Sequence, residues 1–210
     1  KSESTATSSL DRKRKATEPE LTVTTIDPFY DLTLIIGAPG SSHGQAAFRV
    51  NKGTLRHASE IWTKMLTGAW AESKQSEIEF PDDSPWAFEL VLRVAHLQMD
   101  ALPAVLDLAQ MEELARLTDK YNLGKLVEVA LASKQWLNNA RSAWQKWPAE
   151  PSYQDWAVIN HVFRSQDDYE YLVTRLAVEV QVDEKYISYY YGSGETKTEL
   201  KSDLPDRIQG

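Results

Sequence analysis

The order of strand-like and helix-like segments between residues 31 and 137 constrains the fold more than any other feature of the sequence. Residues 32–36 are apolar and rich in β-formers, and a glycine-rich loop separates them from a second strand-like segment at 46–50. Helical spacing of apolar residues begins near residue 59, is interrupted by the alternating segment Glu77-Ile-Glu-Phe80, and then continues. Strands first and helices afterwards predict an α+β domain in which helices pack around a small sheet.

Local signals indicate where the helices begin. Ser59 can act as the N-cap of the first helix, and Ser84 followed by Pro85 has the N-cap and first-turn preferences that open the next one. Further helices are expected from about residue 105 to 121 and from 125 to 138, with a glycine-containing break between them. These segments supply the helices that would cover the sheet.

Changes in composition divide the chain into four regions. Residues 1–25 are polar and poor in large apolar side chains, so they are predicted to be a disordered tail. Residues 26–142 contain the α+β domain. Two prolines near the end of this domain mark a boundary, and residues 143–187 are predicted to form an extension of two helices. Residues 188–210 are polar and contain glycine, which predicts a flexible tail.

The charge and the cysteine content argue against several classes of function. The formal net charge is −8, and an acidic surface does not suit direct nucleic-acid binding, which depends on clustered Lys and Arg. The chain has no cysteine, so disulfides and thiolate metal sites are excluded and a reducing compartment is expected. No segment approaches the roughly 18 consecutive apolar residues of a membrane span, so no membrane partner is expected.

No pattern of catalytic, cofactor-binding or metal-ligating residues emerges from the sequence. The loop at 37–44 contains glycines and serines but lacks the lysine spacing of a phosphate-binding loop. The histidines His43, His57, His96 and His161 are isolated from one another, without the helix-face spacing of metal ligands. We therefore expect no catalytic residue, no cofactor and no metal. An enzyme with an unrecognised site is the unfavoured alternative.

Several sequence elements occur in a characteristic order. They are Asp31 at the start of the first strand, Phe48-x-Val50-x-Lys52-x-x-Leu55, Ser59-x-x-Trp62-x-x-Met65-Leu66, Gly68-Ala-Trp-x-Glu72 and Leu114-Ala-x-Leu-x-Asp-Lys-Tyr121. This ordered set covers about half of the chain and resembles a BTB/POZ domain. The segment 81–88 and the C-terminal helices are similar to BTB proteins that are common in filamentous fungi.

The resemblance implies a fold and a function. The fold is that of BTB/POZ domains, a small sheet of three or more strands flanked by a cluster of helices, here with a C-terminal helical extension. The function is that of a non-catalytic protein–protein interaction module, which self-associates by dimerisation or binds another protein. The alternative is a substrate adaptor of a cullin-type ubiquitin ligase, with a cullin as the partner.

The resemblance also implies partner-binding residues. Some BTB dimers place an acidic residue at the position of Asp31 and a basic one at that of Lys52, in a charged pocket near the dimer interface. The alternative is that Asp31 only terminates a strand and Lys52 is solvated. The β-branched segment 21–26 is either an extra N-terminal strand, paired within the chain or across a dimer, or a loosely tethered linker.

Two further predictions concern short motifs. Cullin-binding BTB adaptors carry an apolar-x-Glu element before the third strand, and Trp70-Ala-Glu72 lies at that position. The alternative is that Trp70 packs on its own fold. The basic cluster Arg12, Lys13, Arg14 and Lys15 predicts a nuclear-import signal or an anion-binding patch, or else a solvated run of charges. We therefore expect a nuclear or cytoplasmic localisation.

Overall fold

A computed structural model of the chain describes residues 21–67, 74–140, 153–185, 187–191 and 197–200. Its N-terminal half contains a four-stranded mixed sheet with the strand order β1-β3-β2-β4. The strands are β1 (Thr22–Thr25), β2 (Leu32–Gly37), β3 (Gln45–Val50) and β4 (Glu77–Phe80). β2 and β3 are antiparallel, whereas β1 runs parallel to β3 and β4 runs parallel to β2. The three strands expected from the hydrophobic pattern are therefore confirmed.

The N-terminal segment forms the fourth strand of this sheet. Thr22 to Thr25 pair in register with β3, so the predicted disordered tail is wrong at its C-terminal end. Ile26 anchors the strand because its side chain is buried and its backbone N–H donates to the Arg49 carbonyl at 2.9 Å. Of the alternatives for residues 21–26, the structure has the strand that pairs within the chain, and burial of Ile26 explains why it is not a loose linker.

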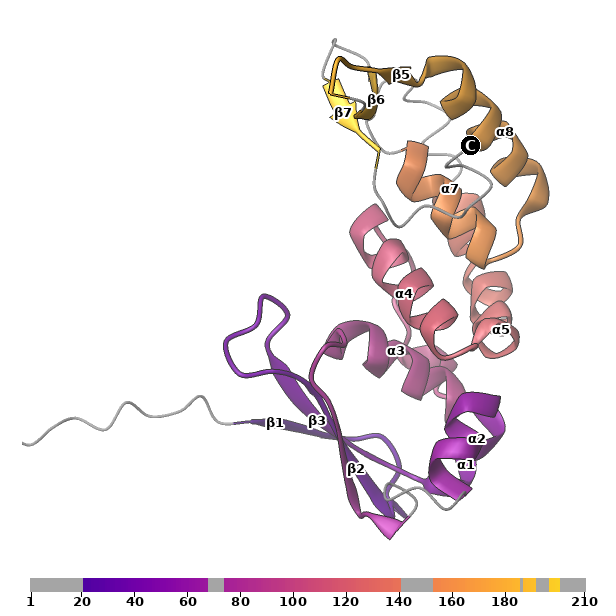
Figure 1. The fold of residues 1–210 in the computed structure, drawn as a ribbon. Coiled ribbons are helices and arrows are strands. Elements are labelled where there is room, and N and C mark those ends of the chain that lie inside the picture. Colours follow the sequence, from indigo (N-terminus) through magenta and orange to yellow (C-terminus); the bar gives the residue numbers. More distant parts are fainter. Residues whose placement is uncertain (1–20, 68–73, 141–152, 186, 192–196, 201–210) are drawn as a thin grey trace, which may run out of the picture.

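Helices cover the sheet and then extend away from it (Figure 1). The chain up to residue 140 contains α1 (Lys52–Ala58), α2 (Glu60–Thr67), α3 (Pro85–Ala95), the 3₁₀ turn η2 (Met99–Ala101), α4 (Leu108–Lys120), α5 (Gly124–Lys134) and a further helical stretch at 136–140. The predicted caps are confirmed. The Ser84 Oγ accepts the N–H of Ala87 at 3.4 Å, and the Ser59 Oγ accepts that of Ile61 at 3.1 Å.

Two of the helices differ from their predicted spans. α4 begins at Leu108 rather than near residue 105, because Asp107 and Gln110 form a reciprocal capping box that fixes its first turn. The helix predicted over 125–138 is divided at Gln135, which has a left-handed φ of 53°. A single left-handed residue ends the hydrogen-bonded ladder and redirects the chain.

The C-terminal region contains the two predicted helices, α7 (Tyr153–Val162) and α8 (Gln166–Glu179). They form a hairpin, and α7 packs on α4, so the hairpin lies at the end of the molecule far from the sheet (Figure 1). Three short strands follow, β5 (Gln181–Val182), β6 (Ser188–Tyr191) and β7 (Lys197–Glu199), and they form an antiparallel sheet. The flexible tail predicted over 188–210 therefore contains strands, for which the tyrosine run in β6 is favourable.

One continuous core joins all of these helices to the sheet. Its centre is an aromatic cluster of Trp62, Phe80, Phe88 and Tyr121, whose ring centroids lie 5.0–5.9 Å apart. The buried side chains continue from there through α4 and α7 to Leu172 on α8. The two predicted regions thus share a hydrophobic core.

Candidate interaction surface

The structure brings Asp31 and Lys52 together, although not through their two charged groups. Asp31 lies just before β2, and its Oδ1 accepts the backbone N–H of Lys52 at 2.7 Å, at the first residue of α1. The carboxylate thus satisfies one of the unpaired donors at the start of that helix. The Lys52 ammonium donates to the carbonyl of Gln75. A place for this pair at a dimer interface stays a prediction.

Asn51 and His96 connect the start of α1 to the end of α3. The Asn51 side chain caps α1 by accepting the N–H of Thr54 at 3.2 Å. Its backbone N–H donates to Nε2 of His96 at 3.3 Å, and Nδ1 of the same ring is 2.8 Å from the carbonyl of Leu92. The carboxylate of Asp27 also lies near this ring, with its Oδ2 3.9 Å from Nε2. The ring therefore holds the surface next to it in a fixed geometry.

That adjacent surface is concave and has both apolar and polar lining residues. A hollow of about 320 Å³ is lined by Ile26, Asp27, Pro28, Phe29, Thr54, Ala95, His96, Leu97 and Gln98. Phe29 and Leu97, two of its lining residues, are 85% and 83% exposed. We call the surface formed by Phe29, Leu97 and this hollow the Phe29–Leu97 face. Neither residue was singled out from the sequence, because both lie in loops outside any periodic pattern.

Leu97 is held in an unusual backbone conformation on this face. Its φ is +58°, in the left-handed region that a leucine rarely adopts. The chain is fixed on either side of it, since the Leu97 N–H donates to Val94 and the Gln98 side chain donates to the carbonyl of Ile26 at 2.7 Å. The loop thus presents a large apolar side chain to solvent at a conformational cost.

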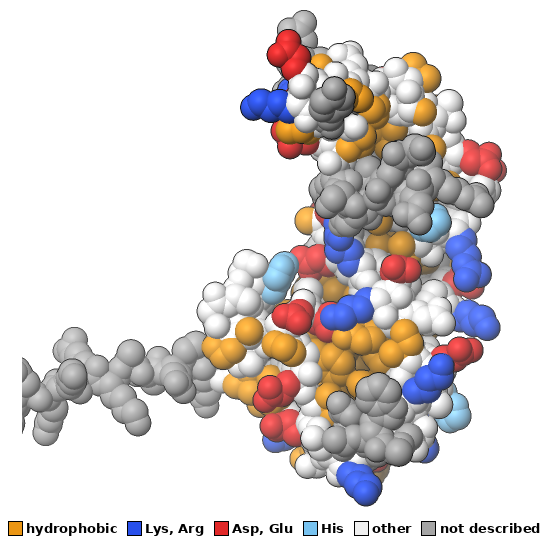
Figure 2. Space-filling view, in the orientation of Figure 1, with side chains coloured by type: hydrophobic (Ala, Val, Ile, Leu, Met, Phe, Trp, Pro, Cys, Tyr) orange, Lys and Arg blue, Asp and Glu red, His pale blue; other side chains and the backbone are white. Residues whose placement is uncertain are grey.

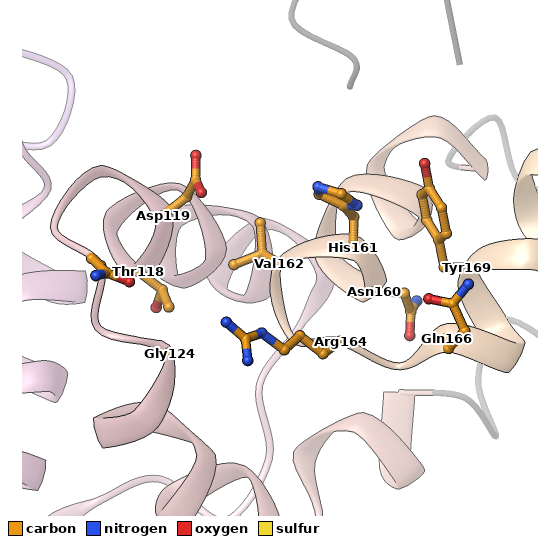
Figure 3. A pocket seen from close by; sticks show the side chains of 10 residues that line it. Thr118, Asp119, Gly124, Asn160, His161, Val162, Arg164, Gln166 and Tyr169 are labelled. Carbon is orange, nitrogen blue, oxygen red and sulfur yellow. The ribbon is translucent and has the colours of Figure 1, made fainter. Parts of the chain in front are cut away.

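A second, polar hollow lies where the α4–α5 turn meets the α7–α8 hairpin (Figure 3). It has a volume of about 450 Å³, and its lining residues are Thr118, Asp119, Asn122, Gly124, Asn160, His161, Val162, Arg164, Gln166 and Tyr169. We call it the junction hollow. It draws residues from both regions of the chain, so no single sequence motif could have indicated it.

The remaining predicted site residues lie outside the described part of the chain. Trp70 and Glu72 fall within residues 68–73, and the basic cluster Arg12 to Lys15 falls within residues 1–20. Within the described ranges, no group of three His, Cys, Asp or Glu side chains could hold a metal ion. No described helix has both the length and the apolar character that a membrane crossing requires.

Comparison with known families identifies the N-terminal half. The BTB/POZ domain family matches residues 25–133, just over half of the 210-residue chain. No curated protein matches the chain. The matched span begins at the last residue of β1 and ends within α5, and it encloses β2, β3, β4 and the aromatic cluster. The chain therefore belongs to the BTB/POZ domain family, whose fold is a non-catalytic module for protein–protein interaction.

Proposed function

We propose that this chain is a non-catalytic adaptor that self-associates through the Phe29–Leu97 face and the neighbouring edge of the sheet. The observation that carries the proposal is the exposure of two large apolar side chains beside one hollow, Phe29 at 85% and Leu97 at 83%. Single exposed apolar residues are ordinary, but a pair flanking a concave surface indicates an interaction site.

The strand β1 supplies a second element of the same surface. It lies at the edge of the four-stranded sheet, with β3 as its partner on the inner side. Val23, in the middle of β1, is 47% exposed, and Figure 2 shows hydrophobic surface where this strand enters the sheet. An edge strand can accept another strand through its unpaired backbone groups.

A second copy of the chain is the occupant that fits an edge of this kind. Two copies related by a two-fold axis can offer the same edge and the same apolar face to one another, so each contact is made twice. Asp31 immediately precedes β2, and Lys52 is the first residue of α1. We propose that both residues lie at the rim of the dimer interface. Each copy has a formal net charge of −8, so added salt should strengthen the association by screening repulsion.

Light scattering on size-exclusion fractions tests this proposal over a concentration series. The wild-type chain should dimerise at micromolar concentration, and Phe29→Ser should raise the dissociation constant about tenfold or more. Leu97→Asn should weaken association in the same way, because asparagine tolerates the left-handed backbone and leaves the loop intact. Val178→Ser is the matched control, since Val178 is 80% exposed on α8. A monomeric wild type, or a dimer indifferent to Phe29→Ser, would overturn the proposal.

The second candidate function is that of a substrate adaptor for a cullin-type ubiquitin ligase. It is supported by the position of Trp70-Ala-Glu72 shortly before β4, where cullin-binding BTB adaptors carry an apolar residue and a glutamate. A pull-down with the wild-type chain and with Trp70→Ala/Glu72→Ala protein tests it. Recovery of a cullin by the wild type alone would support it, and recovery by neither would exclude it.

The cellular location and the wider relationship are also proposals. We propose that the cluster Arg12 to Lys15 directs nuclear import, and that the chain is of the type common in filamentous fungi, with helices appended to the BTB domain. A fluorescent fusion in which these four residues are replaced by alanine should leave the nucleus. An unchanged distribution would assign the cluster to a solvated charge run.

A further inference from the structure

We propose that the junction hollow binds a carboxylate, carried either by an acidic segment of a partner protein or by a small free acid. The site is separate from the Phe29–Leu97 face, so it does not depend on self-association. One wall comes from the end of α4 and the start of α5, and the other from the end of α7 and the start of α8 (Figure 3). A ligand placed there would contact the BTB domain and its helical extension together.

Two buried hydroxyl groups in the hollow lack hydrogen-bond partners. They are Oγ1 of Thr118, a residue that is 2% exposed, and the phenol oxygen of Tyr169, which is 7% exposed. Within the described part of the chain, the other such side-chain atom is Nε1 of Trp62, which lies in the aromatic cluster and not in the hollow. A buried hydroxyl without a partner is destabilising, so each of these groups indicates a missing partner.

The hollow also contains a cation aimed at its interior. Figure 3 shows Arg164 extending from the turn between α7 and α8 toward Thr118 near the end of α4 and Gly124 at the start of α5. Arg164 is held in the left-handed region, with a φ of +58°. A guanidinium presents planar donors that match the two oxygens of a carboxylate. Its direction and the unpaired Thr118 hydroxyl therefore favour one kind of ligand, a group with several acceptor oxygens.

The start of α5 adds positive potential at the same place. Its N-cap residue is Leu123, which cannot cap through its side chain, and its first turn contains no acidic residue. The backbone N–H groups near Gly124, which lines the hollow, are therefore not compensated by a local anion. The start of α8 differs, because Asp167 and Asp168 lie in its first turn.

The balance of charge favours a carboxylate over a phosphate. The charged residues that line the hollow are Arg164 and Asp119, with His161 as a titratable neighbour. In Figure 3 the Asp119 side chain points away from the guanidinium, which leaves Arg164 open to an anion. A monoanion would pair with Arg164, whereas a phosphate dianion would add a second negative charge near Asp119. One carboxylate can accept from the guanidinium and from the Thr118 hydroxyl, whereas the Tyr169 phenol lies toward the other end of the hollow (Figure 3).

Calorimetric titration of the full chain with succinate, with a glutamate-rich peptide and with inorganic phosphate tests this proposal. Succinate or the peptide should bind, and Arg164→Gln should weaken that binding about tenfold or more, because it removes a charge-assisted hydrogen bond. Binding of the peptide well above that of succinate assigns the site to an acidic segment of a partner, and equal binding assigns it to a free acid. Binding of phosphate alone would overturn the carboxylate assignment.

Variants of the two hydroxyl groups separate a binding role from a structural one. Thr118→Val and Tyr169→Phe keep the shape of the side chains and remove the unpaired groups. Each should raise the melting temperature of the free protein, but only Thr118→Val should also weaken carboxylate binding, because Tyr169 points away from Arg164 (Figure 3). Thr174→Val, at an exposed position on α8, is the matched control. A lower melting temperature with unchanged binding would mean that the hydroxyls are satisfied by water, and would overturn the proposal.

Discussion

Two sites that share the C-terminal end of α4 treat buried polar groups in opposite ways. At the aromatic cluster, the carboxylate of Asp83 is 8% exposed and fully engaged. It accepts hydrogen bonds from Nζ of Lys120 at 2.7 Å and from the phenol of Tyr121 at 2.6 Å. At the junction hollow, Thr118 of the same helix and Tyr169 keep unpaired hydroxyls.

This difference indicates different roles for the two sites, a structural role for Asp83 and a binding role for the junction hollow. Asp83 precedes α3, so its two hydrogen bonds fasten the end of α4 to the segment that follows β4. A buried carboxylate is tolerated because it has charged and neutral donors at close range. The hydroxyls of the junction hollow carry no charge and can stay unpaired at smaller cost, which makes them available to a ligand. Removing a group should therefore destabilise the first site and stabilise the second.

The largest expected effect tests whether the BTB domain and the helical extension unfold together. Phe88→Ala removes a fully buried ring from the aromatic cluster and should lower the free energy of unfolding by about 3–5 kcal/mol. Leu172→Ala on α8 should cost about 2–5 kcal/mol. Because Phe88 and Leu172 belong to one core, each variant should shift the same single unfolding transition. Tryptophan fluorescence and far-ultraviolet circular dichroism should both report this transition.

The control for this pair is Tyr171→Ala, at a position on α8 that is 52% exposed. It should shift the transition far less than Leu172→Ala. Two separate transitions, with Leu172→Ala moving only one of them, would contradict a shared core. The BTB domain and the helical extension would then unfold as independent domains.

The sequence predicts the order of the main elements because their causes are local. The hydrophobic periodicity of a segment, and N-caps such as Ser59 and Ser84, depend only on residues close in sequence. The site residues depend on distant contacts. Asp83 reads as an ordinary turn residue until α4 brings Lys120 and Tyr121 to it. The junction hollow likewise needs turns from two regions of the chain to meet, and the pairing of β1 with β3 is set by tertiary packing.

The second prediction concerns the hydrogen bond between Tyr121 and Asp83. Tyr121→Phe should lower the free energy of unfolding by about 1–3 kcal/mol at neutral pH, because it leaves a buried carboxylate with one donor fewer. Burial, and then the hydrogen bond to Asp83, raise the pKa of Tyr121 well above its ordinary value of 10.0. The folded chain therefore keeps this proton at a pH where the unfolded chain releases it.

The sign of the pH dependence follows from that difference. Below about pH 10 both states hold the proton and the contribution to stability is fully present; above it the unfolded state gains by ionising and the wild type loses stability. The gap between the wild type and Tyr121→Phe in urea unfolding should thus be constant near neutrality and shrink at alkaline pH. A gap that stays the same through this range would refute the assignment, and Tyr171→Phe controls for the loss of an exposed tyrosine hydroxyl.

The smallest expected effect concerns Asp183, next to the C-terminal sheet. Like Asp83, this carboxylate has several hydrogen-bond donors, but it is partly exposed to solvent. Asp183 accepts the N–H groups of Ile187 at 3.0 Å and Lys185 at 2.9 Å, and the ammonium of Lys197 at 3.0 Å. The hydrogen bond from Ile187, followed by that from Lys197, holds the pKa of Asp183 below its ordinary value. The stability from this group is present above that ordinary value and is lost as the pH falls through the folded value.

Lys197→Met should therefore lower the melting temperature only slightly, because an exposed ion pair is weakened by hydration and by salt. The loss should vanish in concentrated salt and at a pH low enough to protonate Asp183, whereas the exposed Lys185→Met, which leaves the backbone donor in place, should have no comparable effect. A loss that persists in high salt would mean that Lys197 acts instead through its packing on Tyr189, whose ring centroid is 4.2 Å from the ammonium. In that case, the difference in solvent exposure between Asp83 and Asp183 would not explain why Asp83 contributes more to stability.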